Sequence, residues 1–153
     1  MRISEFVPPE AVVPDLRAET KEGVLRELSE AIAGTVPSLS AETLAAILME
    51  RERLGSTGIG GGAAIPHGKA PGIDRMVAAF GRSRAGVQFQ SLDGKPAHLI
   101  FAIVAPEQSA GMHLKALARI SRLLKDDRFR RSLLEAGDAD DLRRVFREQD
   151  ERG

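Results

Sequence analysis

The chain has 153 residues, of which 42% are hydrophobic and 29% charged, a composition typical of one globular domain rather than a disordered segment. Its 22 basic and 22 acidic side chains cancel, so net charge gives no general attraction to nucleic acid or to an anionic membrane. The sequence contains no cysteine, which excludes disulfides, thiolate metal sites and thiol nucleophiles.

No apolar run approaches the roughly 18 residues that a membrane-spanning helix needs. The first ten residues also lack the basic-then-apolar layout of a signal peptide. There is no linker or internal repeat. We therefore expect a cytoplasmic protein with one domain over residues 1–153, without membrane insertion and without a nucleic-acid partner.

The N-terminal third is predicted to be extended at first and then helical. Residues 1–18 contain three prolines and are expected to be extended chain or a short strand. Apolar residues at helical spacing, with a capping Thr or Ser in front, predict helices over 20–34 and 40–54. Arg51 and Arg53 fall in the last turn of the second helix, where the helix dipole favours cations.

The middle of the chain combines an irregular segment with two strands. The glycine-rich residues 55–72 are predicted to form neither a helix nor a strand. Short apolar runs predict strands over 75–83 and 97–106, and the near-continuous apolar character of the second indicates a strand covered on both faces. Asp93 and Gly94, just before it, indicate a turn.

From about Ser109 onward the apolar pattern is helical. One helix is predicted to begin there, and two further capped helices are predicted over 126–137 and 138–148. In the first of these three helices, the residues that recur at helical spacing and indicate its buried stripe are Leu114, Leu117, Ile120, Ser121 and Leu124. Strands in the middle of the chain, with helices before and after them, favour a layered α/β sandwich.

Nearly half of the chain's fifteen glycines lie in residues 55–72, around the tripeptide Pro66-His67-Gly68. Gly58 to Ala63 fits the loose dinucleotide-binding fingerprint, but that fingerprint requires a strand before it and a helix after it. Here a predicted helix precedes the glycines and Ile65-Pro66 follows, which disfavours a helix start. A phosphate-binding P-loop also fails, because its first glycine and its Ser/Thr would fall on alanines. We therefore expect no nucleotide cofactor.

An alternative interpretation gives His67 no chemical role: the glycines form a flexible surface loop that only contacts partners. Two features favour a functional ring. Before His67, Ile65-Pro66 restricts the backbone to an extended conformation; after it, Gly68 allows the chain to turn freely. Together they would expose the imidazole. A second histidine, His113, falls in the first turn of the helix predicted from Ser109, where backbone N–H groups stabilise an anion.

His67, His113 and Arg51 together suit the transfer of a phosphoryl group to a ring nitrogen. A neutral imidazole is nucleophilic near pH 7, and its phosphoramidate is readily transferred. The transferring group spreads negative charge over its oxygens, which the fixed donors of an arginine match. A neighbouring histidine can hydrogen-bond the phosphoryl group or hold the tautomer of the reactive ring. The usual spacings of metal ligands are absent, and no metal is expected.

The segments RERLGSTGIGGGAAIPHGK and HLKALARISRLL closely resemble the enzyme IIA domains of the fructose/mannitol class (type 2) of the bacterial phosphotransferase system. Within that class, the sequence is most similar to the nitrogen-regulatory enzymes IIA of the PtsN type. The resemblance implies a mixed β-sheet between helices. It also implies that His67 accepts the phosphoryl group, through Nε2, and that Arg51 and His113 support it.

The resemblance further implies a phosphorylated carrier protein, HPr or NPr, as the donor. In the nitrogen branch the phosphorylation state is the output, acting on regulatory targets in potassium homeostasis and nitrogen or carbon metabolism. The alternative is a transport enzyme IIA that passes phosphate to an enzyme IIB. The 153 residues contain no IIB or IIC segment, so we expect the regulatory branch, although separate enzymes IIA of transport systems also exist. His98 stands where relatives usually carry an acidic residue; we expect it to be a hydrogen-bonded structural residue.

Overall fold

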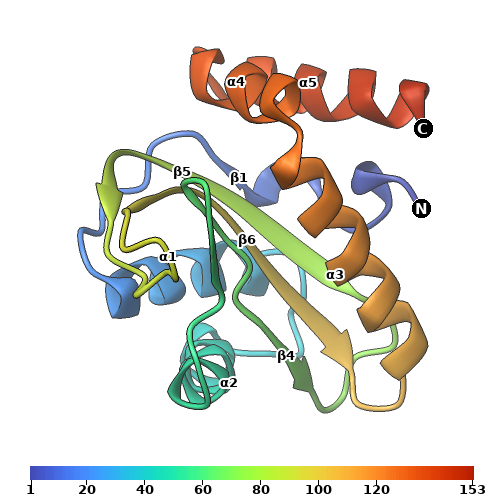
Figure 1. The fold of residues 1–153 in the computed structure, drawn as a ribbon. Helices are drawn as coiled ribbons and strands as arrows, with labels where there is room; N and C mark the ends of the chain where they lie inside the picture. Colours follow the sequence, from blue (N-terminus) through green and yellow to red (C-terminus); the bar gives the residue numbers. More distant parts are fainter.

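The centre of the fold is a pair of long antiparallel strands, β5 (Val77–Val87) and β6 (Ala97–Pro106), in a computed structural model that describes residues 1–153 (Figure 1). Shorter strands extend the sheet on both sides. The strand β1 (Val12–Val13) runs parallel to β5. On the other side, β3 (Ala63–Ala64) and β4 (His67–Ala70) run parallel to β6, and β2 (Gly58–Gly60) pairs antiparallel with β3. The predicted mixed sheet is confirmed.

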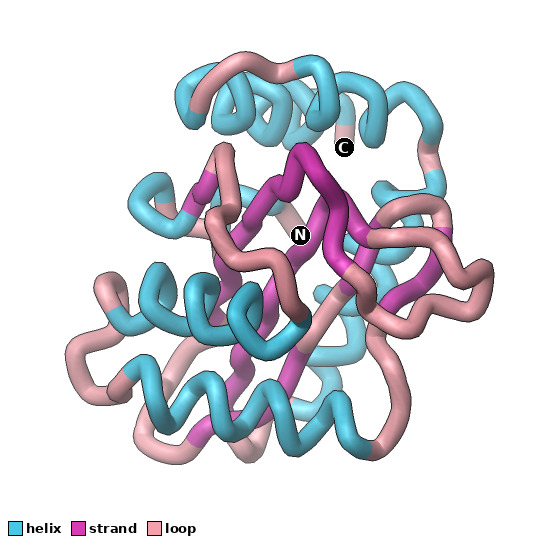
Figure 2. Tube along the Cα trace, turned by 90° about the vertical axis from the view of Figure 1, so that its left-hand side faces the viewer, coloured by secondary structure: helices cyan, strands magenta, loops and turns pink.

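Helices cover both faces of this sheet (Figure 2). The helices α1 (Lys21–Ala33) and α2 (Ala41–Arg53) pack on one face. The helices α3 (Ala110–Lys125), α4 (Asp127–Glu135) and α5 (Ala139–Arg152) pack on the other, together with the 3-10 turn Ile3–Glu5. A second 3-10 turn, Pro9–Ala11, precedes β1 and packs against α1. No helix combines the length and apolar character needed to cross a membrane.

The alternation of side chains along β5 and β6 creates two separate cores. Phe80 and Phe101 point toward α3–α5 and belong to a cluster of 22 buried residues, in which both rings pack against Phe146 of α5. Ala79 and Ala102 point the other way, into a cluster of 17 buried residues with α1 and α2. Small residues on this second face bring the two helices close to the strands.

Side-chain caps explain where four of the five α-helices begin. The hydroxyls of Thr20 and Ser40 accept from the third N–H of α1 and of α2, as the sequence predicts. Asp126 caps α4, and Asp138 forms a capping box with Asp141 at the start of α5. The helix α3 has no such cap.

Two sequence predictions about local structure are wrong. The glycine-rich segment is not irregular throughout, because it contains β2, β3 and β4; residues 60–62, with φ of 86°, 65° and 81°, form the turn between β2 and β3 that glycine alone adopts freely. The buried stripe of α3 also differs. Ile120 and Leu124 face the sheet as predicted, but Leu114 is exposed, and His113, Ala116 and Leu123 are buried beside them.

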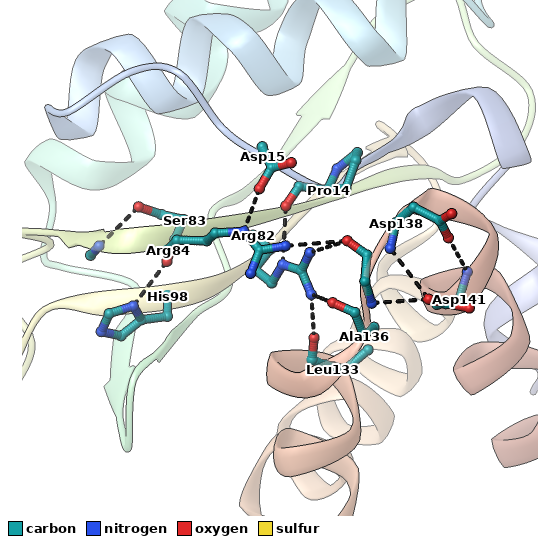
Figure 3. Close-up of polar contacts among 12 residues, drawn as sticks. Pro14, Asp15, Arg82, Ser83, Arg84, His98, Leu133, Ala136, Asp138 and Asp141 are labelled. Carbon is teal, nitrogen blue, oxygen red and sulfur yellow. Dashed lines mark hydrogen bonds and ion pairs between the residues drawn. The ribbon is translucent and has the colours of Figure 1, made fainter.

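A fully buried arginine ties the C-terminal helices to the sheet (Figure 3). Arg82 of β5 donates hydrogen bonds to the carbonyls of Leu133, Ala136 and Gly137, at and after the end of α4, and to that of Pro14 beside β1. Carbonyls at a helix C-terminus carry partial negative charge and lack partners within the helix. The guanidinium therefore satisfies them, although no carboxylate contacts it.

We expect Arg82→Met to lower the free energy of unfolding by about 2–4 kcal/mol, because it leaves several buried carbonyls without a donor. Urea denaturation measures this change. The matched control is Arg84→Met on the same strand, which removes the exposed ion pair with Asp15 and should cost less than about 1 kcal/mol. Equal losses for the two variants would contradict the role given to Arg82.

Candidate functional site

His67 is the first residue of β4, and its ring is partly exposed. The ring nitrogen Nδ1 lies 2.8 Å from the carbonyl oxygen of Ile65. A carbonyl can only accept, so this contact places the proton of the neutral ring on Nδ1. The lone pair is then on Nε2, which is the nitrogen available as a nucleophile.

Close packing of α2 on β4 brings Arg51 to the same region. A side chain at Gly68 would place its Cβ 2.5 Å from Cγ2 of Ile47, so glycine is required here for close approach and not for an unusual φ. Arg51 lies one helical turn after Ile47 and therefore on the same face of α2. Its guanidinium donates to the carbonyl of Gly55 at 2.9 Å, and its charge acts on His67.

His113 approaches His67 from the opposite helical layer. The two rings are nearly perpendicular, with centroids 5.4 Å apart. His113 is buried, and its Nε2 has no hydrogen-bond partner. A buried polar atom without a partner is uncommon, and this nitrogen keeps its hydrogen-bonding capacity for a group from outside the chain.

The N-terminal turn of α3, which carries His113, differs from the start of every other α-helix. Ser109 precedes the helix, but its hydroxyl donates to the carbonyl of Pro106 and caps no N–H of α3. The first N–H groups of this helix therefore keep their donor capacity and the positive end of the helix dipole. An anion at this position would be stabilised by both.

The structure thus brings together all three residues predicted from the sequence. It places His67 on a strand, not on a loop, and His113 within the buried face of α3, not at its edge. His98 donates through Nδ1 to the Ser83 carbonyl at 2.9 Å, as expected for a structural residue (Figure 3). No three His, Asp or Glu side chains are arranged to hold a metal ion.

Sequence reasoning missed three residues beside the site, which are Glu52, Lys21 and Thr57. Glu52, next to Arg51, is buried and accepts hydrogen bonds from the side chain of Lys21 and from Thr57. One signal in the sequence points to it: a carboxylate in the last turn of a helix faces the negative end of the dipole and needs compensation.

The electrostatic surroundings favour neutral rings in both histidines. Burial lowers the pKa of His67 below its ordinary value of 6.5; the hydrogen bond to Ile65 opposes this effect, the charge of Arg51 adds to it, and Glu52 opposes it. Burial also lowers the pKa of His113, and the neighbouring charges of His67 and Lys69 lower it further. The nucleophilic form of His67 is therefore the main form at pH 7.

We expect a pH titration followed by NMR to give His67 a pKa below 6.5. In Arg51→Gln this pKa should rise, because a positive charge that disfavours the imidazolium is removed. Arg53→Gln is the matched control, since that arginine is exposed and paired with Glu50. A wild-type pKa at or above 6.5 would contradict this description of the site.

Comparison with known proteins agrees with this geometry. The chain is 40% identical over 139 residues to the nitrogen regulatory protein of Bradyrhizobium diazoefficiens, covering 91% of this chain and 90% of that protein. It is 36% identical over 150 residues to the fructose-specific EIIABC component of Bacillus subtilis, covering 98% of this chain and 24% of that protein. The crystal structure of nitrogen regulatory protein IIA-Ntr from Neisseria meningitidis superposes with a TM-score of 0.87 at 34% identity, covering 94% of this chain and 98% of that one.

The family model that matches is described as "Phosphoenolpyruvate-dependent sugar phosphotransferase system, EIIA 2" and covers residues 5–149. The chain therefore belongs to the type-2 enzyme IIA family of the phosphotransferase system.

Proposed function

We propose that this protein is a histidine phosphocarrier in which His67 accepts a phosphoryl group from a phosphorylated carrier protein of the HPr or NPr kind. The observation that carries the proposal is the orientation of the ring: Nδ1 is held by the Ile65 carbonyl, and Nε2 keeps its lone pair. Membership of a phosphotransferase family makes phosphorus the expected electrophile.

In the proposed step, Nε2 of His67 attacks the phosphorus of the donor's phosphohistidine. The new N–P bond forms as the N–P bond of the donor breaks, and its electron pair returns to the donor's ring nitrogen. Nδ1 keeps its proton and its hydrogen bond throughout. No net oxidation or reduction occurs, and no cofactor or metal takes part.

Positive groups around the ring would stabilise the charge on the transferring oxygens. Arg51 uses one N–H in its bond to Gly55, and its other donors make no hydrogen bond within the chain. On the opposite helical layer, the unpaired Nε2 of His113 and the uncapped first turn of α3 would also hydrogen-bond these oxygens. We assign Arg51 to charge stabilisation and His113 to hydrogen bonding of the phosphoryl group.

Incubation of the chain with phosphorylated HPr should add one acid-labile, base-stable phosphate, and His67→Ala should abolish it. Arg51→Ala should slow the transfer roughly a hundredfold with an unchanged circular dichroism spectrum, because a donor to the transition state is lost. Arg53→Ala is the control and should transfer at the wild-type rate. Phosphate incorporation into His67→Ala would refute the assignment, and so would an unaffected rate in Arg51→Ala.

The output of phosphorylation is proposed to be regulatory. The nitrogen regulatory proteins among the relatives match this chain over most of both lengths. We infer that the phosphorylated and unphosphorylated forms bind regulatory targets differently, with potassium and nitrogen metabolism as the processes affected.

A transport role is the second candidate, favoured by the 36% identity to the fructose-specific protein of Bacillus subtilis. The two roles differ in where the phosphate goes next. We expect the phosphorylated chain to keep its phosphate when mixed with a purified fructose-type enzyme IIB. Rapid transfer to that protein, followed by mass spectrometry of both partners, would instead support the transport role.

A further inference from the structure

A continuous chain of hydrogen bonds connects the His67 ring to a buried ion pair between two helices. Ile65 accepts from Nδ1 of His67 through its carbonyl, and its own N–H donates to the carbonyl of Thr57 at 3.0 Å. Both the N–H and the hydroxyl of Thr57 donate to the carboxylate of Glu52. The ammonium of Lys21 donates to the same carboxylate at 2.9 Å.

The two charges of this ion pair each lie at the unfavourable end of a helix. Lys21 is the first residue of α1, where the dipole is positive, and Glu52 is in the last turn of α2, where it is negative. Both are buried, and Lys21 also lies over the ring of Phe89, 5.1 Å from its centroid. Buried ion pairs add little net stability compared with apolar residues of similar volume, and their best-attested use is to fix a specific geometry.

Further hydrogen bonds hold the chain on both sides of Thr57. Arg51, adjacent to Glu52, donates to the carbonyl of Gly55. The hydroxyl of Ser56 donates to the carbonyl of Phe89, and the N–H of Gly58 donates to that hydroxyl at 3.0 Å. The segment leading from α2 to β2 is thus fixed at nearly every residue, and its position determines where the Thr57 carbonyl lies.

We propose that Glu52, neutralised by Lys21, is a positioning residue for His67 and acts through Thr57 and Ile65. Glu52 fixes Thr57; Thr57 fixes the peptide of Ile65; and the carbonyl of Ile65 fixes the tautomer and direction of the ring. The consequence for transfer rests on the proposed function, whereas the effect on the tautomer does not.

Lys21 also affects the electrostatics of the site, because it neutralises the charge of Glu52. The Glu52 carboxylate is close enough to act on the charge of His67. An unpaired carboxylate at that position would repel an approaching phosphoryl group. The Lys21 ammonium offsets this negative charge, while the oxygens of Glu52 still accept from Thr57.

The decisive experiment measures the tautomer of His67 from the ¹⁵N chemical shifts of its two ring nitrogens in the unphosphorylated protein. Thr57→Val keeps the shape of the side chain but removes the hydroxyl that bonds Glu52, so a fraction of the rings should move the proton to Nε2. Thr57→Ser restores the hydroxyl and should restore the wild-type shifts. Thr35→Val is the matched control, because it also removes one hydroxyl hydrogen bond, to Ile32 at the end of α1.

Phosphoryl transfer from phosphorylated HPr to Thr57→Val should be roughly tenfold slower, since a small misplacement of a reacting atom lowers the rate steeply. Thr35→Val and Thr57→Ser should transfer at the wild-type rate. Glu52→Gln should shift the ring nitrogens in the same direction as Thr57→Val, and it decides the matter if Thr57→Val does not fold. Wild-type shifts in both folded variants would overturn the proposal, as would a shifted tautomer with an unchanged transfer rate.

The test also separates this proposal from the proposed function. If the wild-type chain takes no phosphate from the carrier, the proposed function fails and the tautomer comparison still tests the control by Glu52. If the wild-type chain is phosphorylated and the variants keep wild-type tautomers, the proposed function stands and the positioning role fails.

Discussion

The hydrogen bond between Nδ1 of His67 and the carbonyl of Ile65 is the constraint on which the rest of the site depends. It determines which nitrogen has the lone pair and in which direction that lone pair points. The other parts of the site are arranged around this direction. Arg51 comes from α2 on one side of the sheet and His113 from α3 on the other, and both reach the ring because β4 is a short strand at the sheet's edge.

Much of the fold could be predicted from the sequence because local signals agreed with tertiary packing. The caps at Thr20, Ser40, Asp126 and Asp138 mark helices that form as expected. The near-continuous apolar sequence of β6 indicated a strand covered on both faces, and both cores contact it. His67, Arg51 and His113 could be singled out because their chemistry is complementary, and the structure places them together.

Other features could not be predicted, because they depend on contacts between segments far apart in the chain. The short strands of the glycine-rich segment form only because β6 offers an edge for pairing. The requirement for Gly68 comes from Ile47, and the burial of Arg82 comes from the carbonyls after α4. The hydrophobic period of α3 assigned Leu114 to the core, whereas the helix is rotated so that His113 lies there instead.

The unusual start of α3 has a consequence for how a partner could distinguish two states of this protein. A helix end without a cap leaves its first backbone amides without acceptors, and such amides exchange with solvent readily. A negative group covalently attached to the neighbouring ring would complete that end and slow the exchange of Ala110, Gly111 and Met112. Recognition could then depend on the order of a single helical turn, with the sheet and both cores unchanged.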